Sequence, residues 1–247
     1  MADYTCDPIL RGRLRLWQPR RGYRLSVDSL LLVDFARPRG GRPPRRLIDL
    51  CAGGGVIGLG LAVALPRAEV VLAELQPEMV ALAQRNVDEN RLGERVQIVA
   101  VDLGDGAEAR RLLPGASFDL VAASPPFFRL QEGPTVDDEG EALARHELRM
   151  TLGDLAREAK RLLVPGGRAT VVFPSQRLVE LLAELATRGL QPTRLRLVHP
   201  RPGAAAQRAL VEAVKGGKGG LLVDPPLYLR DHQGDYSVEA KGALGEA

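Results

Sequence analysis

Short apolar segments alternate with amphipathic segments along most of this 247-residue chain, and this alternation limits the possible folds more than any other feature. Hydrophobic periodicity predicts strands at 47–51, 69–75, 96–101, 118–123 and 168–173, and helices at 55–65, 77–90, 151–163 and 176–188. Further strands are predicted near 194–199 and 208–214. Strands as apolar as Val70 to Ala73 are typical of parallel sheets that helices cover on both faces. We therefore predict a doubly wound α/β fold.

The first 46 residues precede this pattern and have local signals of their own. The alternation at 13–17 predicts an edge strand, and Gln18-Pro19 with Gly22 predicts a turn after it. A helix is expected over 29–36, and the Pro, Gly and Arg residues of 37–46 are typical of a linker. The chain is thus expected to comprise a small N-terminal extension, 1–46, and a main domain, 47–247.

Positive charge is concentrated in that extension. Residues 1–46 hold eleven arginines, no lysine and four acids, a net charge of +7, whereas the whole chain carries only +3. A basic segment beside a near-neutral body is typical of proteins with a polyanionic partner, because neutralised phosphates release counterions. Nucleic acid is therefore the favoured partner, and a solvated arginine-rich face is the alternative.

The cysteines and histidines indicate a setting without disulfides or metal. Cys6 and Cys51 are expected to be unpaired, and the three histidines show no metal-ligand spacing with them. The N-terminal residues lack a charged-then-apolar pattern and no apolar run approaches the roughly 18 residues of a membrane helix, so we expect neither a secretory leader nor a membrane span. The expected location is the cytoplasm, without membrane or metal; the sequence does not specify an oligomeric state.

A glycine-rich loop and a series of acids point to a nucleotide-type ligand. The loop Asp49 to Gly55 lies where the first main-domain strand turns into a helix, so its backbone can approach a ligand closely. Glu74 follows 19 residues beyond Gly55 at the end of the next strand, where an acid that binds ribose hydroxyls is expected, and Asp102 ends the third. Parallel strands would bring these acids to one edge of the sheet.

The fourth strand is followed by Ser124-Pro125-Pro126-Phe127. The prolines lack N–H donors and have a fixed φ, which leaves carbonyls free to accept hydrogen bonds, while Phe127 offers a flat apolar surface. Such a tetrad can hold a planar amine for alkylation. Taken alone it also fits a strand-ending turn.

At these positions the chain resembles the methyltransferases that depend on S-adenosyl-L-methionine (AdoMet), with Cys51 where a glycine is commoner. The resemblance implies a Rossmann-like, seven-stranded, mostly parallel sheet that ends in an antiparallel hairpin. It also implies that Glu74 binds the cofactor ribose, Asp102 the adenine amine, and the loop backbone the methionine end. The implied cofactor-binding residues are Asp49, Cys51, Ala52, Gly53, Gly55, Glu74, Asp102, Leu103 and Ser124.

A closer resemblance covers nearly the whole chain and is carried by motifs in order. Gln18-Pro19 with 22–32, Arg145-His146-Glu147, and the segments 215–221, 225–227 and 234–237 resemble the bacterial tRNA adenine-N6 methyltransferases that modify adenine 37 of a valine tRNA. That family has Asn-Pro-Pro-Tyr at the tetrad, so Ser124 and Phe127 are departures. A serine hydroxyl still accepts hydrogen bonds, and we expect the chemistry to survive.

In this interpretation, Ser124 and the Pro125 carbonyl accept the two N–H bonds of the adenine amine, and the unstacked base lies on Phe127. The predicted catalytic residues are Ser124, Pro125, Pro126 and Phe127. The segment 128–149 is expected to be either a lid or a loop without function. Further candidates for substrate contacts are Arg20, Arg21, Tyr23, Arg24, Asp28, Arg145, His146, Lys215 and Lys218.

Three alternatives stay open at this point. A protein-glutamine methyltransferase uses a similar tetrad, but such enzymes usually carry a larger helical domain in front. An rRNA guanine-N2 methyltransferase is the second. The third is a noncatalytic RNA-binding module that retains the fold, motivated by the departures at Ser124 and Cys51.

Overall fold

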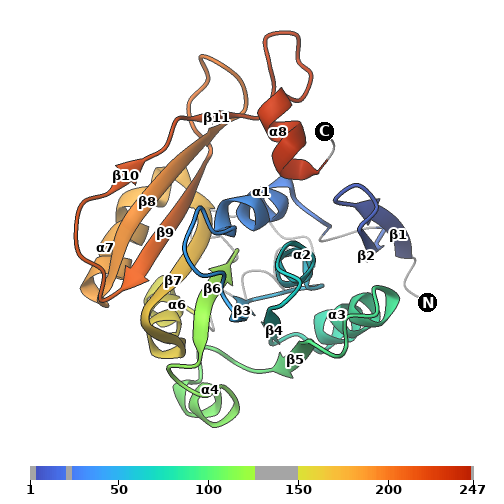
Figure 1. Cartoon of the computed structure of the whole chain (residues 1–247), viewed down its shortest axis with the longest axis vertical. Coiled ribbons are helices and arrows are strands. Elements are labelled where there is room, and N and C mark those ends of the chain that lie inside the picture. The colour runs from blue at the N-terminus through green and yellow to red at the C-terminus, as the bar shows by residue number, and fades with distance from the viewer. Residues whose placement is uncertain (1–3, 21–23, 126–149, 246–247) are drawn as a thin grey trace, which may run out of the picture.

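A computed structural model describes residues 4–20, 24–125 and 150–245 of the chain (Figure 1). Its strands are β1 (Tyr4–Ile9), β2 (Leu14–Pro19), β3 (Arg46–Leu50), β4 (Glu69–Glu74), β5 (Val96–Ala100), β6 (Phe118–Ala123), β7 (Leu163–Pro174), β8 (Leu190–His199), β9 (Arg208–Lys215), β10 (Leu222–Val223) and β11 (Leu227–Tyr228). Its helices are α1 (Val27–Ala36), α2 (Val56–Ala64), α3 (Pro77–Glu89), α4 (Gly106–Leu112), α6 (Leu152–Leu162), α7 (Leu178–Thr187) and α8 (Val238–Leu244), with a short 3-10 helix η1 (Ser175–Arg177).

The main sheet of the described residues has the strand order β10-β8-β9-β7-β6-β3-β4-β5, and β11 also pairs with β8. Strands β3 to β7 are parallel to their neighbours among themselves, whereas β9 runs antiparallel to both β7 and β8. The predicted doubly wound sheet with a final antiparallel hairpin is therefore confirmed. The two-residue strands β10 and β11 extend it beside β8.

Helices cover both faces of this sheet, as the apolar strands require. On one side, α1, α2 and α3 contribute Leu32, Leu59 and Val87 to a common hydrophobic core. On the other side, α4 and α6 contribute Ala109 and Leu162 to a second core. Because both faces are buried, the ends of the strands are where functional groups can meet solvent.

The N-terminal strands form a separate antiparallel hairpin that lies against α3 (Figure 1). The strand predicted at 13–17 is thus one arm of this hairpin, and it is not an edge of the main sheet. Its inward positions, Leu14 and Leu16, are fully buried, while Arg15 between them is exposed. This alternation anchors the basic N-terminal segment to the main domain.

Helix α1 packs closely on α2. A Cβ at Gly60 of α2 would lie 2.8 Å from a methyl group of Val33 in α1, so only glycine permits this approach. Asp28, at the start of α1, pairs with Arg208 of β9 at 2.7 Å. The helix therefore joins the two halves of the sheet.

Candidate active site

The loop between β3 and α2 is a tight turn in the left-handed region of backbone space. Cys51, Gly53 and Gly55 have φ values of 59°, 55° and 87°. Glycine adopts such values without strain, but a cysteine there carries a steric cost. The turn is closed by a hydrogen bond of 2.8 Å from the Gly55 N–H to the Ala52 carbonyl. The predicted loop therefore has the conformation that a close backbone approach requires.

Glu74 fastens this loop to the end of β4. Its Oε2 accepts a hydrogen bond of 2.7 Å from the Gly53 N–H. Its Oε1 accepts bonds of 2.9 Å from the N–H groups of Leu75 and Gln76. Glu74 as a whole is 5% exposed, and backbone amides rather than water solvate its carboxylate. Glu74 lies where the sequence predicted it, directly beside the glycine loop.

Asp49 is buried below the loop and is only partly hydrogen-bonded. Its Oδ2 accepts from the Gly58 N–H at 2.8 Å, while its Oδ1 has no hydrogen-bond partner in the part of the chain that the structure describes. Burial, with a further contribution from the Glu74 charge, raises the pKa of Asp49 to about 8 against the opposing effect of the Gly58 N–H. Asp49 is therefore mostly protonated at neutral pH.

Burial also raises the pKa of the Cys51 thiol, and the charges of Glu74 and Asp49 add to the effect. The thiol contacts the sulfur of Met150 at 3.9 Å. A neutral thiol is a poor nucleophile, so this environment argues against covalent chemistry at Cys51.

The end of β5 completes the acidic edge. The Asp102 N–H donates to Glu108 at 2.9 Å, and the Asp102 carboxylate accepts from the Gly104 N–H at 2.8 Å. Leu103 beside it is buried. Because the Val101 N–H bonds the Glu74 carbonyl at 2.9 Å, the ends of β4 and β5 lie together. The structure thus brings the three predicted acids to one edge of the sheet.

The tetrad begins at the same edge. Leu50 pairs with Ala123 in the parallel β3–β6 ladder, so Cys51 and Ser124 each follow a paired position on neighbouring strands. Ser124 is half-buried and Pro125 is buried. Pro126 and Phe127 lie outside the described residues, as do Arg21, Tyr23, Arg145 and His146. The first half of the tetrad is therefore adjacent to the glycine loop.

The other candidates for substrate contacts are spread over the molecule. Arg24 pairs with Asp7 at 3.0 Å and donates to the Pro19 carbonyl at 2.9 Å, Asp28 pairs with Arg208, and Arg20 is exposed. Lys215 ends the antiparallel strand β9, so it and the exposed Lys218 lie at the opposite sheet edge from Glu74. The Lys215 ammonium donates to the Leu163 carbonyl at 2.6 Å. The structure does not bring these two lysines to the candidate site.

Asn86 is a site residue that sequence reasoning missed. It is fully buried on α3 and donates a hydrogen bond of 2.9 Å to the Gly54 carbonyl of the loop. Its position four residues after Leu82 and three after Ala83, within the apolar stripe of a helix, was the available signal.

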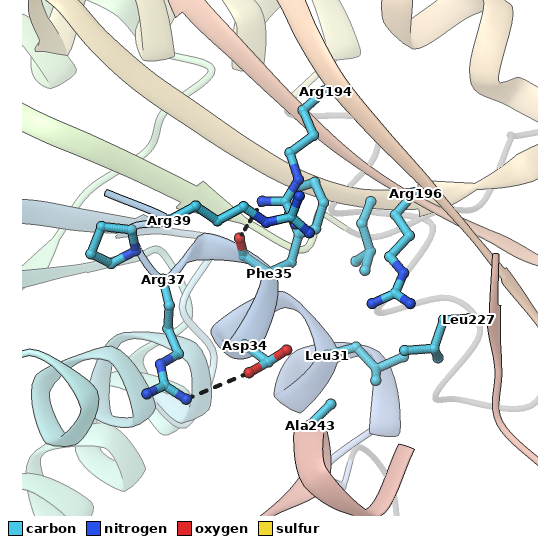
Figure 2. A pocket seen from close by; sticks show the side chains of 11 residues that line it. Leu31, Asp34, Phe35, Arg37, Arg39, Arg194, Arg196, Leu227 and Ala243 are labelled. Atoms are coloured by element: carbon cyan, nitrogen blue, oxygen red, sulfur yellow. Dashed lines mark hydrogen bonds and ion pairs between the residues drawn. The ribbon is translucent and has the colours of Figure 1, made fainter. Parts of the chain in front are cut away.

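A cavity of about 260 Å³ lies at the C-terminal end of α1 (Figure 2). The guanidinium of Arg194 stacks on Phe35 at 3.9 Å from the ring centre. Both Arg194 and Arg39 donate to Asp224, at 2.7 Å and 2.8 Å. Asp224 thereby connects Arg39 of the linker 37–46 with Arg194 of β8, so the two arginines that line the cavity are engaged in structural ion pairs.

Among the described residues, no group of three or more His, Cys, Asp or Glu side chains is arranged to hold a metal ion. Within the same residues, we find no helix with the length and apolar character needed to cross a membrane.

Comparison with known proteins identifies the family. The model of the methyltransferase small domain family matches residues 26–187, which is more than half of the chain. The chain belongs to this family. The match includes the glycine loop, Glu74, Asp102 and the tetrad, so this methyltransferase carries its candidate site within the matched part.

Curated relatives of this methyltransferase share one name. A tRNA1(Val) (adenine(37)-N6)-methyltransferase of Porphyromonas gingivalis is 32% identical over 76% of this chain and 73% of its own length. A protein of the same name from Tolumonas auensis is 27% identical over 90% of this chain and 88% of its own. The family resemblance inferred from the sequence motifs is confirmed.

Solved structures agree on the fold. A predicted O-methyltransferase from Agrobacterium tumefaciens is 27% identical, with a TM-score of 0.71 over 89% of this chain and 97% of that one. TrmN from Thermus thermophilus, 22% identical, has a TM-score of 0.51 over 76% of this chain and 48% of its own and supports the fold alone. This methyltransferase therefore has the Rossmann-like architecture expected from its sequence.

Proposed function

We propose that the protein transfers a methyl group from AdoMet to the N6 amine of an adenine in tRNA. The observation that carries the proposal is the position of the Ser124-Pro125 backbone directly beside the loop that ends β3. A donor held by the loop and an amine held by the tetrad then meet between neighbouring strands. The names of the curated relatives support tRNA, and adenine 37 of a valine tRNA, as the acceptor.

The residues at this edge fit AdoMet. The left-handed turn at Gly53 and Gly55 leaves backbone accessible, and Asp49 Oδ1 is a buried polar atom without a partner among the described residues. The Glu74 carboxylate offers about four acceptor positions. Glu74 uses three of them on backbone N–H groups, which leaves one for a ribose hydroxyl without breaking the loop. Asp102, at the next strand end, is the candidate for the adenine amine.

When bound, AdoMet supplies an electrophilic methyl group on a positively charged sulfur. The protein's contribution is orientation, because the adenine amine is a weak nucleophile whose lone pair is delocalised into the ring. Hydrogen bonds from that amine to Ser124 and the Pro125 carbonyl would direct the nitrogen lone pair at the methyl group. A strong base is not required, since the proton can leave after transfer. Cys51, with its neutral thiol, has no covalent role in this scheme.

The basic N-terminal segment supports a polyanionic substrate. The hairpin that carries Arg11 and Arg13 is fixed to α3, where Arg15 pairs with Glu89 at 2.9 Å, so the exposed cations Arg11 and Arg13 are held on the surface of the folded domain. Phosphates are the groups that such arginines bind. The cytoplasm, where tRNA is modified, is the corresponding location.

The test uses methyl-labelled AdoMet with unmodified tRNA, followed by identification of the labelled nucleoside by mass. We expect N6-methyladenosine, and label confined to guanine or to protein would refute the proposal in favour of the alternative acceptors. Phe127→Ala is expected to lower turnover on RNA about tenfold or more, because base stacking on an aromatic ring contributes about 1–3 kcal/mol. The dissociation constant of AdoMet should stay within about twofold of the wild-type value, since Phe127 is assigned only to the acceptor. Equal loss of both properties would contradict that assignment.

A further inference from the structure

A single buried amide connects the N-terminal hairpin to the glycine loop. Asn86 has no solvent exposure. Its Oδ1 accepts a hydrogen bond of 2.7 Å from the Trp17 N–H in β2. Its Nδ2 donates to the Trp17 carbonyl at 3.2 Å and to the Gly54 carbonyl at 2.9 Å. Three segments that are distant in sequence thus meet at one side chain.

These three hydrogen bonds depend on one another. A buried amide that loses a partner cannot turn to water, so each broken bond leaves a desolvated polar group. The loop is also packed tightly at this point, because a Cβ at Gly54 would lie 3.2 Å from Leu82 of α3. The Gly54 carbonyl is therefore held in direction by Asn86 and in place by the helix.

Gly54 lies between the two residues that shape the loop. Gly53 before it donates its N–H to Glu74, and Gly55 after it has the left-handed φ of 87° that starts α2. Rotation of the peptide plane that contains the Gly54 carbonyl changes the φ of Gly55. The direction of this carbonyl thus affects the cofactor loop itself.

We propose that Asn86 is a positioning residue for binding of the methyl donor, acting through the Gly54 carbonyl and anchored by the Trp17 backbone. The inference rests on the proposed function for the identity of the donor, AdoMet. It assigns the hairpin a second role beyond carrying positive charge: its backbone completes the support of the cofactor loop.

Asn90, one helical turn later, provides a matched control. Its Oδ1 accepts from the Arg15 N–H at 2.8 Å and its Nδ2 donates to the Arg15 carbonyl at 2.7 Å, the same two-bond clamp on β2. Its third bond, of 2.7 Å, goes to the Asn86 carbonyl within α3 and not to the loop. A comparison of the two asparagines therefore separates attachment of the hairpin from positioning of the loop.

The first experiment measures AdoMet binding and steady-state kinetics for Asn86→Ala and Asn90→Ala. We expect Asn86→Ala to weaken AdoMet binding about tenfold and to raise the KM for AdoMet, while kcat at saturating AdoMet changes much less. Asn90→Ala should leave AdoMet affinity within about twofold of wild type, although both variants lose a hairpin clamp. Equal effects of the two variants, or no effect of Asn86→Ala, would overturn the inference.

The second experiment uses the wild-type protein and so does not depend on whether a variant folds. Amide hydrogen exchange of Trp17 and Arg15 is measured with and without saturating AdoMet. AdoMet should slow exchange of the Trp17 N–H, which bonds Asn86, several times more than exchange of the Arg15 N–H, which bonds Asn90. Equal slowing would reflect general stabilisation and would overturn the role of Asn86.

The same measurements distinguish failure of the inference from failure of the proposed function. Wild-type protein that does not bind AdoMet overturns both. AdoMet binding and adenine methylation that are indifferent to Asn86 overturn the inference alone.

Discussion

Replacing Asp49 with asparagine is expected to change how the free energy of unfolding depends on pH. Asp49 is 1% exposed and its Oδ1 lacks a partner among the described residues, so the charged form is strongly disfavoured in the folded protein. Burial raises its pKa from the ordinary 3.8 to about 8. Each factor of ten in proton affinity corresponds to about 1.4 kcal/mol. Ionising Asp49 in the folded state therefore costs about 6 kcal/mol more than ionising it in the unfolded state.

The sign follows from counting bound protons in the two states. Below about pH 4 the carboxyl is protonated in both states and contributes no pH dependence. Between about pH 4 and 8 the folded state keeps a proton that the unfolded state has lost, so Asp49 makes stability fall by about 1.4 kcal/mol for each pH unit of increase. The asparagine side chain of the variant cannot titrate, so this part of the pH dependence disappears in Asp49→Asn.

The assay is urea unfolding of both proteins at pH 5, 6, 7 and 8 without AdoMet. The other titrating groups are shared and cancel in the difference between wild type and Asp49→Asn. We expect this difference to shift in favour of the variant by up to about 4 kcal/mol between pH 5 and pH 8. Any constant cost of burying the new amide does not affect the trend. A difference that is independent of pH, or that shifts toward wild type, would refute the assignment of a protonated Asp49.

Two further predictions concern packing and ion pairing. Gly58→Ala should destabilise the protein by about 2–3 kcal/mol, because the new Cβ would lie 2.1 Å from the fully buried Leu72. Gly242→Ala, with open space around its Cβ in helix α8, should stabilise the protein by up to about 1 kcal/mol. Thermal unfolding of both variants checks this, and equal melting temperatures would contradict it. Asp224→Asn should cost about 3 kcal/mol at pH 7, because Arg194 and Arg39 lose their shared carboxylate. Burial opposes ionisation of Asp224, but the two arginines outweigh it and hold its pKa below the ordinary value. The contribution is therefore complete above about pH 4 and is lost as pH falls through the lowered pKa, so urea unfolding should show the gap between wild type and variant narrowing progressively below about pH 4; a gap that does not change as pH falls would count against the ion pair.

The parts of the fold that the sequence predicted well are those with strong local signals. Apolar runs such as Val70 to Ala73 indicate buried parallel strands, and parallel strands necessarily bring Glu74 and Asp102 to one edge. The placement of the cofactor loop followed from the same rule.

The parts that were missed depend on contacts distant in sequence. Strand β1 has no clear alternation and contains Pro8, and it is held by pairing with β2. Helix α4 is a short polar segment whose start is fixed by Asp105 as N-cap. Asn86 is a polar residue whose burial on α3 depends on its hydrogen bond with Trp17, and Trp17 lies 69 residues earlier in the sequence. Lys215 was included among the candidate substrate residues on a motif resemblance, and its place at the end of the antiparallel strand β9 puts it at the opposite end of the sheet from Glu74.

The ion pair between Arg39 and Asp224 has a consequence for how the chain folds during synthesis. The two residues are 185 positions apart, and Asp28 is 180 positions from Arg208, its partner. Neither pair can form until most of the chain has left the ribosome, because contacts of such high sequence separation wait for their later partner. Helix α1 and the linker after it are therefore synthesised early, whereas the ion pairs that attach them to β9 and to Asp224 form late. During translation, α1 can pack on α2, which follows it closely in sequence, but its packing on β7 and its ion pair with β9 wait for segments made much later, so part of its apolar surface stays uncovered until then.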